Sequence, residues 1–76
     1  MPLRILAFAI ASEQLGFRER SVECIPGETP RALLARLHPS FDPSVARVAF
    51  NCEYLGWDDP LEDSGELAIL PPVSGG

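Results

Sequence analysis

The segment GETPRALLARLHP, residues 27–39, constrains the fold most strongly, because both ends of a short helix are marked in it. Thr29 stands at the N-cap, where its hydroxyl can accept a hydrogen bond from an otherwise unpaired N–H. Pro30 follows at the first helical position, where its missing N–H costs nothing. Pro39 ends the helix, because the residue before a proline avoids the α region. The apolar face is formed by Leu33, Leu34 and Leu37. A helix this short is marginal alone, so we expect it to pack on a sheet.

The rest of the chain predicts short strands around this helix. The run from Leu3 to Ala11 and the stretch SVECI read as two strands, joined by the turn material SEQLGFRER. VARVAFNCEYL predicts a third strand, a short turn and a fourth piece, and ELAIL predicts the last strand. The expected order is strand, strand, helix, then three strands. We therefore predict an α+β domain over residues 1–70, with one main helix on one face of a mixed sheet and the first and last strands as neighbours. Residues 71–76 are expected to form a flexible, extended tail that ends in Gly-Gly.

One face of such a sheet has no helix to cover it and should be polar. Side chains alternate between the two faces of a strand, so Arg4 shares a face with Leu6 and Phe8. Leu67 and Ile69 alternate with Ala68 and Leu70 in the same way. We therefore predict that Leu6, Phe8 and Leu70 form an exposed apolar patch, which on a small protein marks a partner surface. The alternative is a bulge that scrambles the alternation.

Composition excludes several classes of function. The net charge of −5 disfavours nucleic acid, which needs a basic face. No apolar run is long enough to span a membrane, and no cleavable leader is visible, so we expect a cytoplasmic protein without membrane association. Cys24 and Cys52 do not form a zinc motif; we expect two small buried residues, with a disulfide as the alternative. No metal site is expected in the acidic turn around Asp58, which lacks the spacing of a calcium loop.

The chain closes on LPPVSGG. Pro71 and Pro72 favour an extended segment, which lowers the entropy lost when the tail enters a channel. Gly75 and Gly76 lack Cβ, so a narrow channel can close around the backbone. The tail after Leu70 can reach roughly 20 Å at about 3.3 Å per residue. These features favour a tail that presents Gly76 to a buried site, with access set by the residues Pro71, Pro72, Val73, Ser74 and Gly75.

The tail and the strand before it resemble the small subunit of molybdopterin synthase, a sulfur carrier with the ubiquitin-like β-grasp fold. The stretches LAFA, EQLG and VAFNCEYL are also similar to that family, so the resemblance covers essentially the whole chain. Ser12 departs from it, because the family often has Arg there; a contact made by that Arg is in doubt.

The resemblance implies a carrier that is not an enzyme on its own and binds no cofactor. An adenylating, E1-like partner would use ATP to activate Gly76, and sulfide transfer would leave a C-terminal thiocarboxylate. The large catalytic subunit would then receive this sulfur in a hetero-oligomer and pass it to a pterin precursor of the molybdenum cofactor. Two alternatives stay open: a sulfur carrier for thiamine, cysteine or transfer RNA thiolation, and a ubiquitin-like protein modifier.

Overall fold

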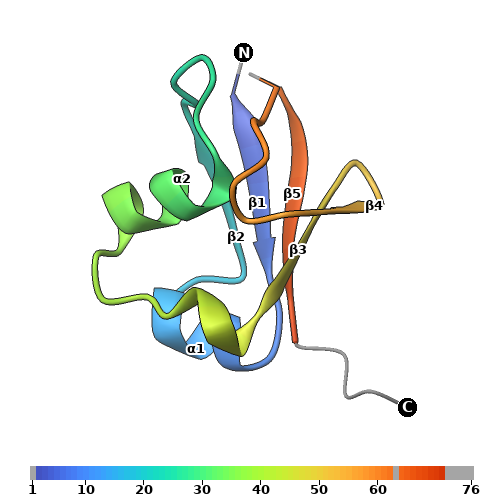
Figure 1. Ribbon diagram of the computed structural model, residues 1–76. Coiled ribbons are helices and arrows are strands. Elements are labelled where there is room, and N and C mark those ends of the chain that lie inside the picture. The colour runs from blue at the N-terminus through green and yellow to red at the C-terminus, as the bar shows by residue number, and fades with distance from the viewer. Residues whose placement is uncertain (1, 63, 72–76) are drawn as a thin grey trace.

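The computed structural model describes residues 2–62 and 64–71 of the 76-residue chain. Its elements run in the order β1 (Leu3–Ala7), α1 (Ile10–Leu15), β2 (Glu19–Val22), α2 (Pro30–Leu37), the 3-10 turn η1 (Pro43–Val45), β3 (Arg47–Phe50), β4 (Glu53–Leu55) and β5 (Gly65–Leu70). The predicted α+β class is confirmed. The predicted order is wrong in one place, because a short helix, α1, stands where the end of the first strand and the start of a turn were expected (Figure 1).

The five strands form one mixed sheet in the order β2-β1-β5-β3-β4. The first and last strands lie side by side and parallel at its centre, as predicted, with Ile5 opposite Leu67. All other neighbouring pairs are antiparallel. Because β5 is a central strand, it is paired on both sides, with β1 as far as Ile69 and with β3 as far as Leu70, which fixes where the following tail leaves the domain.

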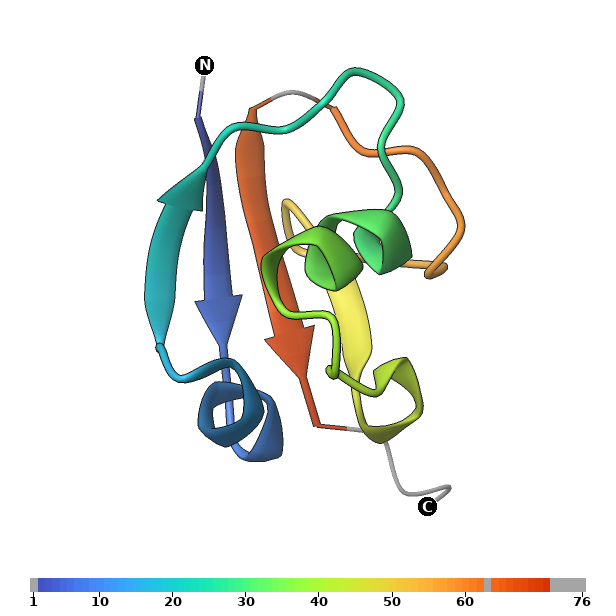
Figure 2. The same cartoon turned by 90° about the vertical axis from the view of Figure 1, so that its left-hand side faces the viewer.

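Helix α2 covers one face of this sheet (Figure 2). The Thr29 hydroxyl accepts a hydrogen bond from the backbone N–H of Ala32 at 3.1 Å, as its predicted capping role requires. The helix ends at Leu37, and the N–H of His38 donates to the carbonyl of Leu34 at 2.7 Å. Among the described residues, no helix is long and apolar enough to cross a membrane.

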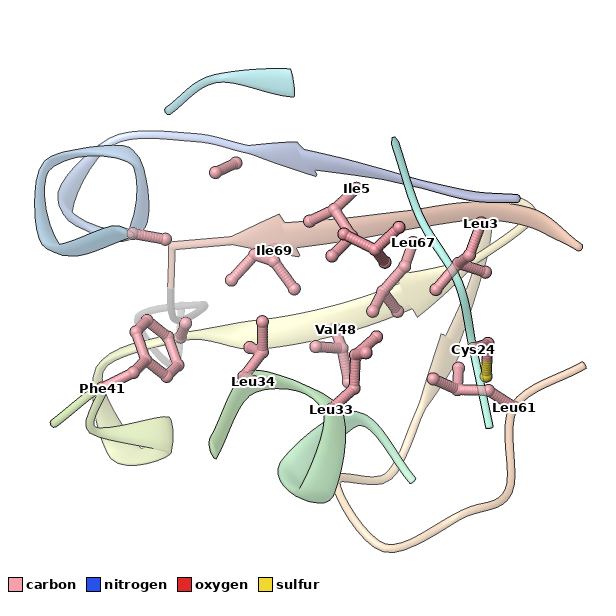
Figure 3. Packing of buried hydrophobic residues seen from close by; sticks show 14 residues of the cluster. Leu3, Ile5, Cys24, Leu33, Leu34, Phe41, Val48, Leu61, Leu67 and Ile69 are labelled. Carbon is pink, nitrogen blue, oxygen red and sulfur yellow. The ribbon is translucent and has the colours of Figure 1, made fainter. Parts of the chain in front are cut away.

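The core lies between α2 and the three central strands. Leu33 and Leu34 of α2 point toward Val48, Leu67 and Ile69, as Figure 3 shows. Every second residue of the central strands joins them, so Leu3, Ile5, Leu67 and Ile69 are all completely enclosed. Burial of a side chain of this kind stabilises the fold by about 1.5–3 kcal/mol each.

Helix α1 interrupts what the sequence presented as one apolar run. β1 ends at Ala7, and Ala9 adopts φ 52° and ψ −130°, which turns the chain into the helix without a side-chain cap. Gly16 ends α1 at φ 80°, with its N–H donating to the carbonyl of Ser12 at 2.9 Å. The second strand consequently lies at Glu19–Val22, not at residues 21–25. The predicted strand over residues 3–11 is therefore too long.

The hairpin of β3 and β4 turns on Asn51 and Cys52, which both have positive φ angles, 50° and 73°. Positive φ at both central residues is typical of the tight turn that suits the twist of antiparallel strands. This turn leaves Cys52 exposed, whereas Cys24 belongs to the buried cluster. The expectation of two buried cysteines is wrong for Cys52, and the two do not form a disulfide with each other.

Candidate functional site

The face of the sheet that α2 leaves uncovered carries a row of apolar side chains. Strand register places Leu6 beside Ala68, Ala68 beside Ala49, and Ala49 beside Tyr54. Leu70 lies one step further along β5, and Phe8 follows β1 on the same side. We call the accessible members of this group, Leu6, Phe8, Tyr54, Ala68 and Leu70, the apolar patch. Phe8 is 45% exposed and Tyr54 is 65% exposed, while the other three are half-buried.

The opposite end of the same face carries ion pairs. Arg4 donates to the carboxylate of Glu66 at 2.9 Å and lies 3.7 Å from that of Glu19. The three side chains come from β1, β5 and β2, so the pairs span three strands. The uncovered face therefore has a charged end, where one arginine is paired with two carboxylates, and an apolar end.

The structure places all three predicted patch residues as the alternation required. Their neighbours Ile5, Leu67 and Ile69 are fully enclosed, so no bulge scrambles the two faces within β1 or β5. This gives Leu6, Phe8 and Leu70 the accessibility that a partner surface needs; that they bind a partner stays a prediction.

Phe8 is held at the rim of a hollow. Its N–H donates to the carbonyl of Ile69 at 3.0 Å, which extends the pairing of β1 with β5. The hollow is lined by Leu6, Phe8, Ile10, Ser12, Glu13 and Arg18, among others. Ala9, between two exposed apolar neighbours, holds a φ angle that non-glycine residues rarely adopt, and such a residue costs of order 1–3 kcal/mol. This backbone conformation carries the chain from β1 into α1, with both Phe8 and Ile10 exposed.

The predicted tail starts at the edge of this patch. Leu70 is the last residue of β5, and Pro71 follows it as an exposed residue. The other predicted tail residues, Pro72, Val73, Ser74, Gly75 and Gly76, lie outside the described residues. The start of the tail and the apolar patch thus share one end of the uncovered face, so a protein that covered the patch would also meet the tail.

Trp57, Arg31 and Asp58, away from the apolar patch, have structural partners. Trp57 donates its indole N–H to the carbonyl of Ala46 at 3.3 Å and lies 6.1 Å from Phe41, between ring centroids, which places it at the edge of the core. Arg31 donates to Asp58 at 2.8 Å, and this hydrogen bond lowers the pKa of that carboxyl. Within the described ranges, no group of three or more His, Cys, Asp or Glu side chains is placed to hold a metal ion.

Four exposed residues near the patch were not predicted from the sequence. Tyr54 and Arg47 could have been found from strand alternation, had the register of β3 with β4 and β5 been known. Ile10 and Arg18 belong to the helix and bend that the apolar run obscured. All four matter here because they extend or border the apolar end of the uncovered face.

Comparison with known proteins bears on the family and on the fold. A model of the ThiS family matches residues 5–76. The chain is 36% identical over 83 residues to the molybdopterin synthase sulfur carrier subunit of Chlamydomonas reinhardtii, with 100% of both chains covered. The crystal structure of SAMP1 from Haloferax volcanii is 26% identical and superposes with a TM-score of 0.73 over 100% of both chains. A protein–protein complex of subunits 1 and 2 of the molybdopterin-converting factor from Helicobacter pylori is similar at a TM-score of 0.61, 20% identity and 100% coverage of both chains. The fold is the ubiquitin-like β-grasp.

Proposed function

The chain belongs to the ThiS family, and we propose that it is the sulfur carrier subunit of a molybdopterin synthase. The observation that carries this proposal is the full-length similarity to the sulfur carrier subunit of Chlamydomonas reinhardtii. The geometry supports it, because the segment that ends in Gly75 and Gly76 leaves the domain beside an uncovered apolar patch. The chain is a donor subunit and performs no catalysis alone.

The chemistry of the tail follows from its carboxyl group. A terminal carboxylate has a pKa of about 3.3–3.7 and is a poor electrophile at neutral pH. An activating enzyme must therefore join the Gly76 carboxylate to the α-phosphorus of ATP, with loss of pyrophosphate. Sulfide then attacks the carbonyl carbon and expels AMP, and loss of the S–H proton leaves a thiocarboxylate. Glycine suits both steps, because it leaves the carbonyl carbon unhindered.

The thiocarboxylate sulfur is the nucleophile that a second partner, the large synthase subunit, directs at a pterin precursor. Attack by this sulfur joins the carrier to the precursor through a thioester. Water then hydrolyses the thioester, which restores the Gly76 carboxylate and leaves the sulfur on the precursor. For this transfer, the globular domain docks through Leu6, Phe8 and Leu70 while the tail extends into the partner's active site. A hetero-oligomer of this type is supported by the Helicobacter pylori complex, in which a chain of the same fold stands beside a second subunit.

The test is reconstitution of sulfur loading with ATP, a sulfur source and the activating enzyme, followed by intact mass. Deletion of Gly76, or addition of one residue after it, moves the reacting carbon by up to about 3.6 Å. A near-attack geometry requires reacting atoms about 3–3.5 Å apart, so both variants should remain unloaded. Circular dichroism should show an unchanged fold, because the core lies within residues before the tail. Normal loading of either variant would exclude this mechanism.

A protein modifier is the second candidate, favoured by the full-length likeness to SAMP1 of Haloferax volcanii. Both candidates require adenylation of Gly76, so loading alone does not separate them. A modifier forms an amide between Gly76 and an amine of another protein. The chain has no lysine of its own, so a polymer linked through lysine side chains is excluded.

A further inference from the structure

Two of the six arginines have neither an acidic nor an aromatic partner within residues 2–62 and 64–71. The sequence holds eleven acidic residues and no lysine, so every cationic side chain apart from the single histidine is an arginine. Three arginines form ion pairs: Arg4 with Glu19 and Glu66, Arg31 with Asp58, and Arg36 with Glu28. Arg20 lies over the ring of Phe17, 5.8 Å from its centroid. The remaining two, Arg18 and Arg47, have no such partner and are both exposed. This is unexpected in a protein of net charge −5, where carboxylates outnumber arginines.

Both exceptions border the apolar patch. Arg47 lies directly opposite Leu70 in the pairing of β3 with β5, on the uncovered face and beside the start of the tail. Arg18 lines the hollow formed by Leu6 and Phe8, and its carbonyl accepts the N–H of Ala7 at 2.9 Å. β1 and β5 stand between the two arginines in the strand order. The patch is therefore flanked on each side by an arginine that forms no ion pair within the described residues, with Glu13 lining the same hollow as Arg18.

We propose that the large subunit covers the apolar patch with a surface that carries two carboxylate-bearing side chains, one for Arg18 and one for Arg47. This inference rests on the proposed function and specifies the chemistry of its docking partner. Guanidinium groups favour carboxylates, since they can form two parallel hydrogen bonds to one. An exposed ion pair contributes little, but a pair at an interface steers the approach of the partner and fixes its orientation.

Orientation matters here because the tail must enter the partner along one path. Apolar contact is not directional, so the patch alone would let the partner dock in several orientations. Two separated cations fix one orientation of the partner across the patch. The rest of this acidic protein repels an acidic surface, so a partner with carboxylates is directed to this end of the domain. The contact of Arg47 beside Leu70 would set the direction in which Pro71 leaves the sheet.

The experiment measures the association rate of the carrier with the purified large subunit of the same organism, by stopped flow at low and high salt. The variants Arg18→Glu and Arg47→Glu are compared with Arg20→Glu, which changes the net charge equally. Arg20 lies opposite Ile5 in the register of β2 with β1, and unlike Arg18 it does not line the hollow beside Phe8. Each test variant should associate roughly ten-fold more slowly at low salt, with the difference shrinking at high salt. Arg20→Glu should stay within about two-fold of the wild type, on the same grounds.

Arg18→Gln and Arg47→Gln, which only remove the charge, should show a smaller decrease in the same direction. They also keep the test valid if a glutamate variant unfolds, which thermal unfolding would reveal. Rates for Arg18 and Arg47 variants equal to that of Arg20→Glu at both salt concentrations would overturn the inference. If the wild type binds and Phe8→Ala weakens binding in that case, the proposed function stands and only the paired carboxylates are excluded. If the wild type does not bind the large subunit, the proposed function fails as well.

Discussion

Replacement of Phe8 with alanine should separate docking from folding. Phe8 is 45% exposed in the free domain, at the end of the sheet where the tail begins. An aromatic side chain buries roughly 200 Å² when it is fully enclosed, so roughly 90 Å² remains for a partner to cover. At about 25 cal/mol per Å², this area corresponds to about 2 kcal/mol of binding free energy. Phe8→Ala should therefore raise the Kd for the large subunit roughly 30-fold.

Ile25 offers a matched control. It is 54% exposed, and it lies beyond Val22, which pairs with Leu3 at the far end of β1 from Phe8. Ile25→Ala removes a comparable accessible apolar area outside the patch, so its Kd should equal that of the wild type. Both variants should keep a cooperative thermal transition, because neither side chain belongs to the enclosed core. By contrast, Ile69→Ala should lower the free energy of unfolding by about 2–5 kcal/mol while the folded fraction binds normally.

Isothermal titration calorimetry with the large subunit gives the Kd, and chemical denaturation gives the free energy of unfolding. The docking hypothesis predicts that Phe8→Ala and Leu70→Ala lose more in binding than Ile25→Ala does at similar stability. If both patch variants unfold the domain and their folded fraction binds as the wild type does, the patch belongs to the core and the assignment of faces is wrong.

Three further predictions concern the stability of the scaffold, each read from denaturation. Gly65→Ala should destabilise the fold, since a Cβ there would lie 2.7 Å from the Phe50 ring at a φ of 137°, and Phe50→Leu should relieve part of the clash. Thr29→Ala should cost about 1 kcal/mol through loss of the helix cap, and Thr29→Ser should not. The hydrogen bond from Arg36 lowers the pKa of Glu28 below its ordinary value of 4.5. The pair of Arg36 with Glu28 therefore stabilises the fold above that pH, and this stabilisation is lost as the pH falls through the lowered pKa. Glu28→Gln should reduce the decrease in the free energy of unfolding that acid causes. If the decrease is the same in the variant, Glu28 is not its source.

The helix α2 and the two faces of the sheet could be predicted because their signals are local. Thr29, Pro30 and Pro39 mark the ends of α2 by backbone chemistry, and alternation along β1 assigns Leu6 and Phe8 to the uncovered face. The pairing of β1 with β5 agreed with the expectation for the fold, but nothing in either strand alone specifies its partner.

Helix α1 could not be found in this way. It begins after Ala9, a residue with no capping side chain and with a φ angle that alanine rarely adopts, so its start has no local signature. Its six residues closely follow an apolar strand. Ala11 is buried in the helix and would also be buried if the strand continued, so its apolar character does not distinguish the two. The positions of Arg18 and Arg47 beside the patch also depend on this helix and on strand register. They follow from tertiary structure, which overrides local preference here.

The intact mass of the protein isolated from its native cells tests the sulfur carrier assignment most directly. We predict a species heavier than the unmodified chain by the replacement of one oxygen with sulfur, which reverts on hydrolysis and is absent when Gly76 is deleted. An unmodified mass under all growth conditions, with the chain instead found in amide linkage to other proteins through Gly76, would contradict the assignment and identify a protein modifier.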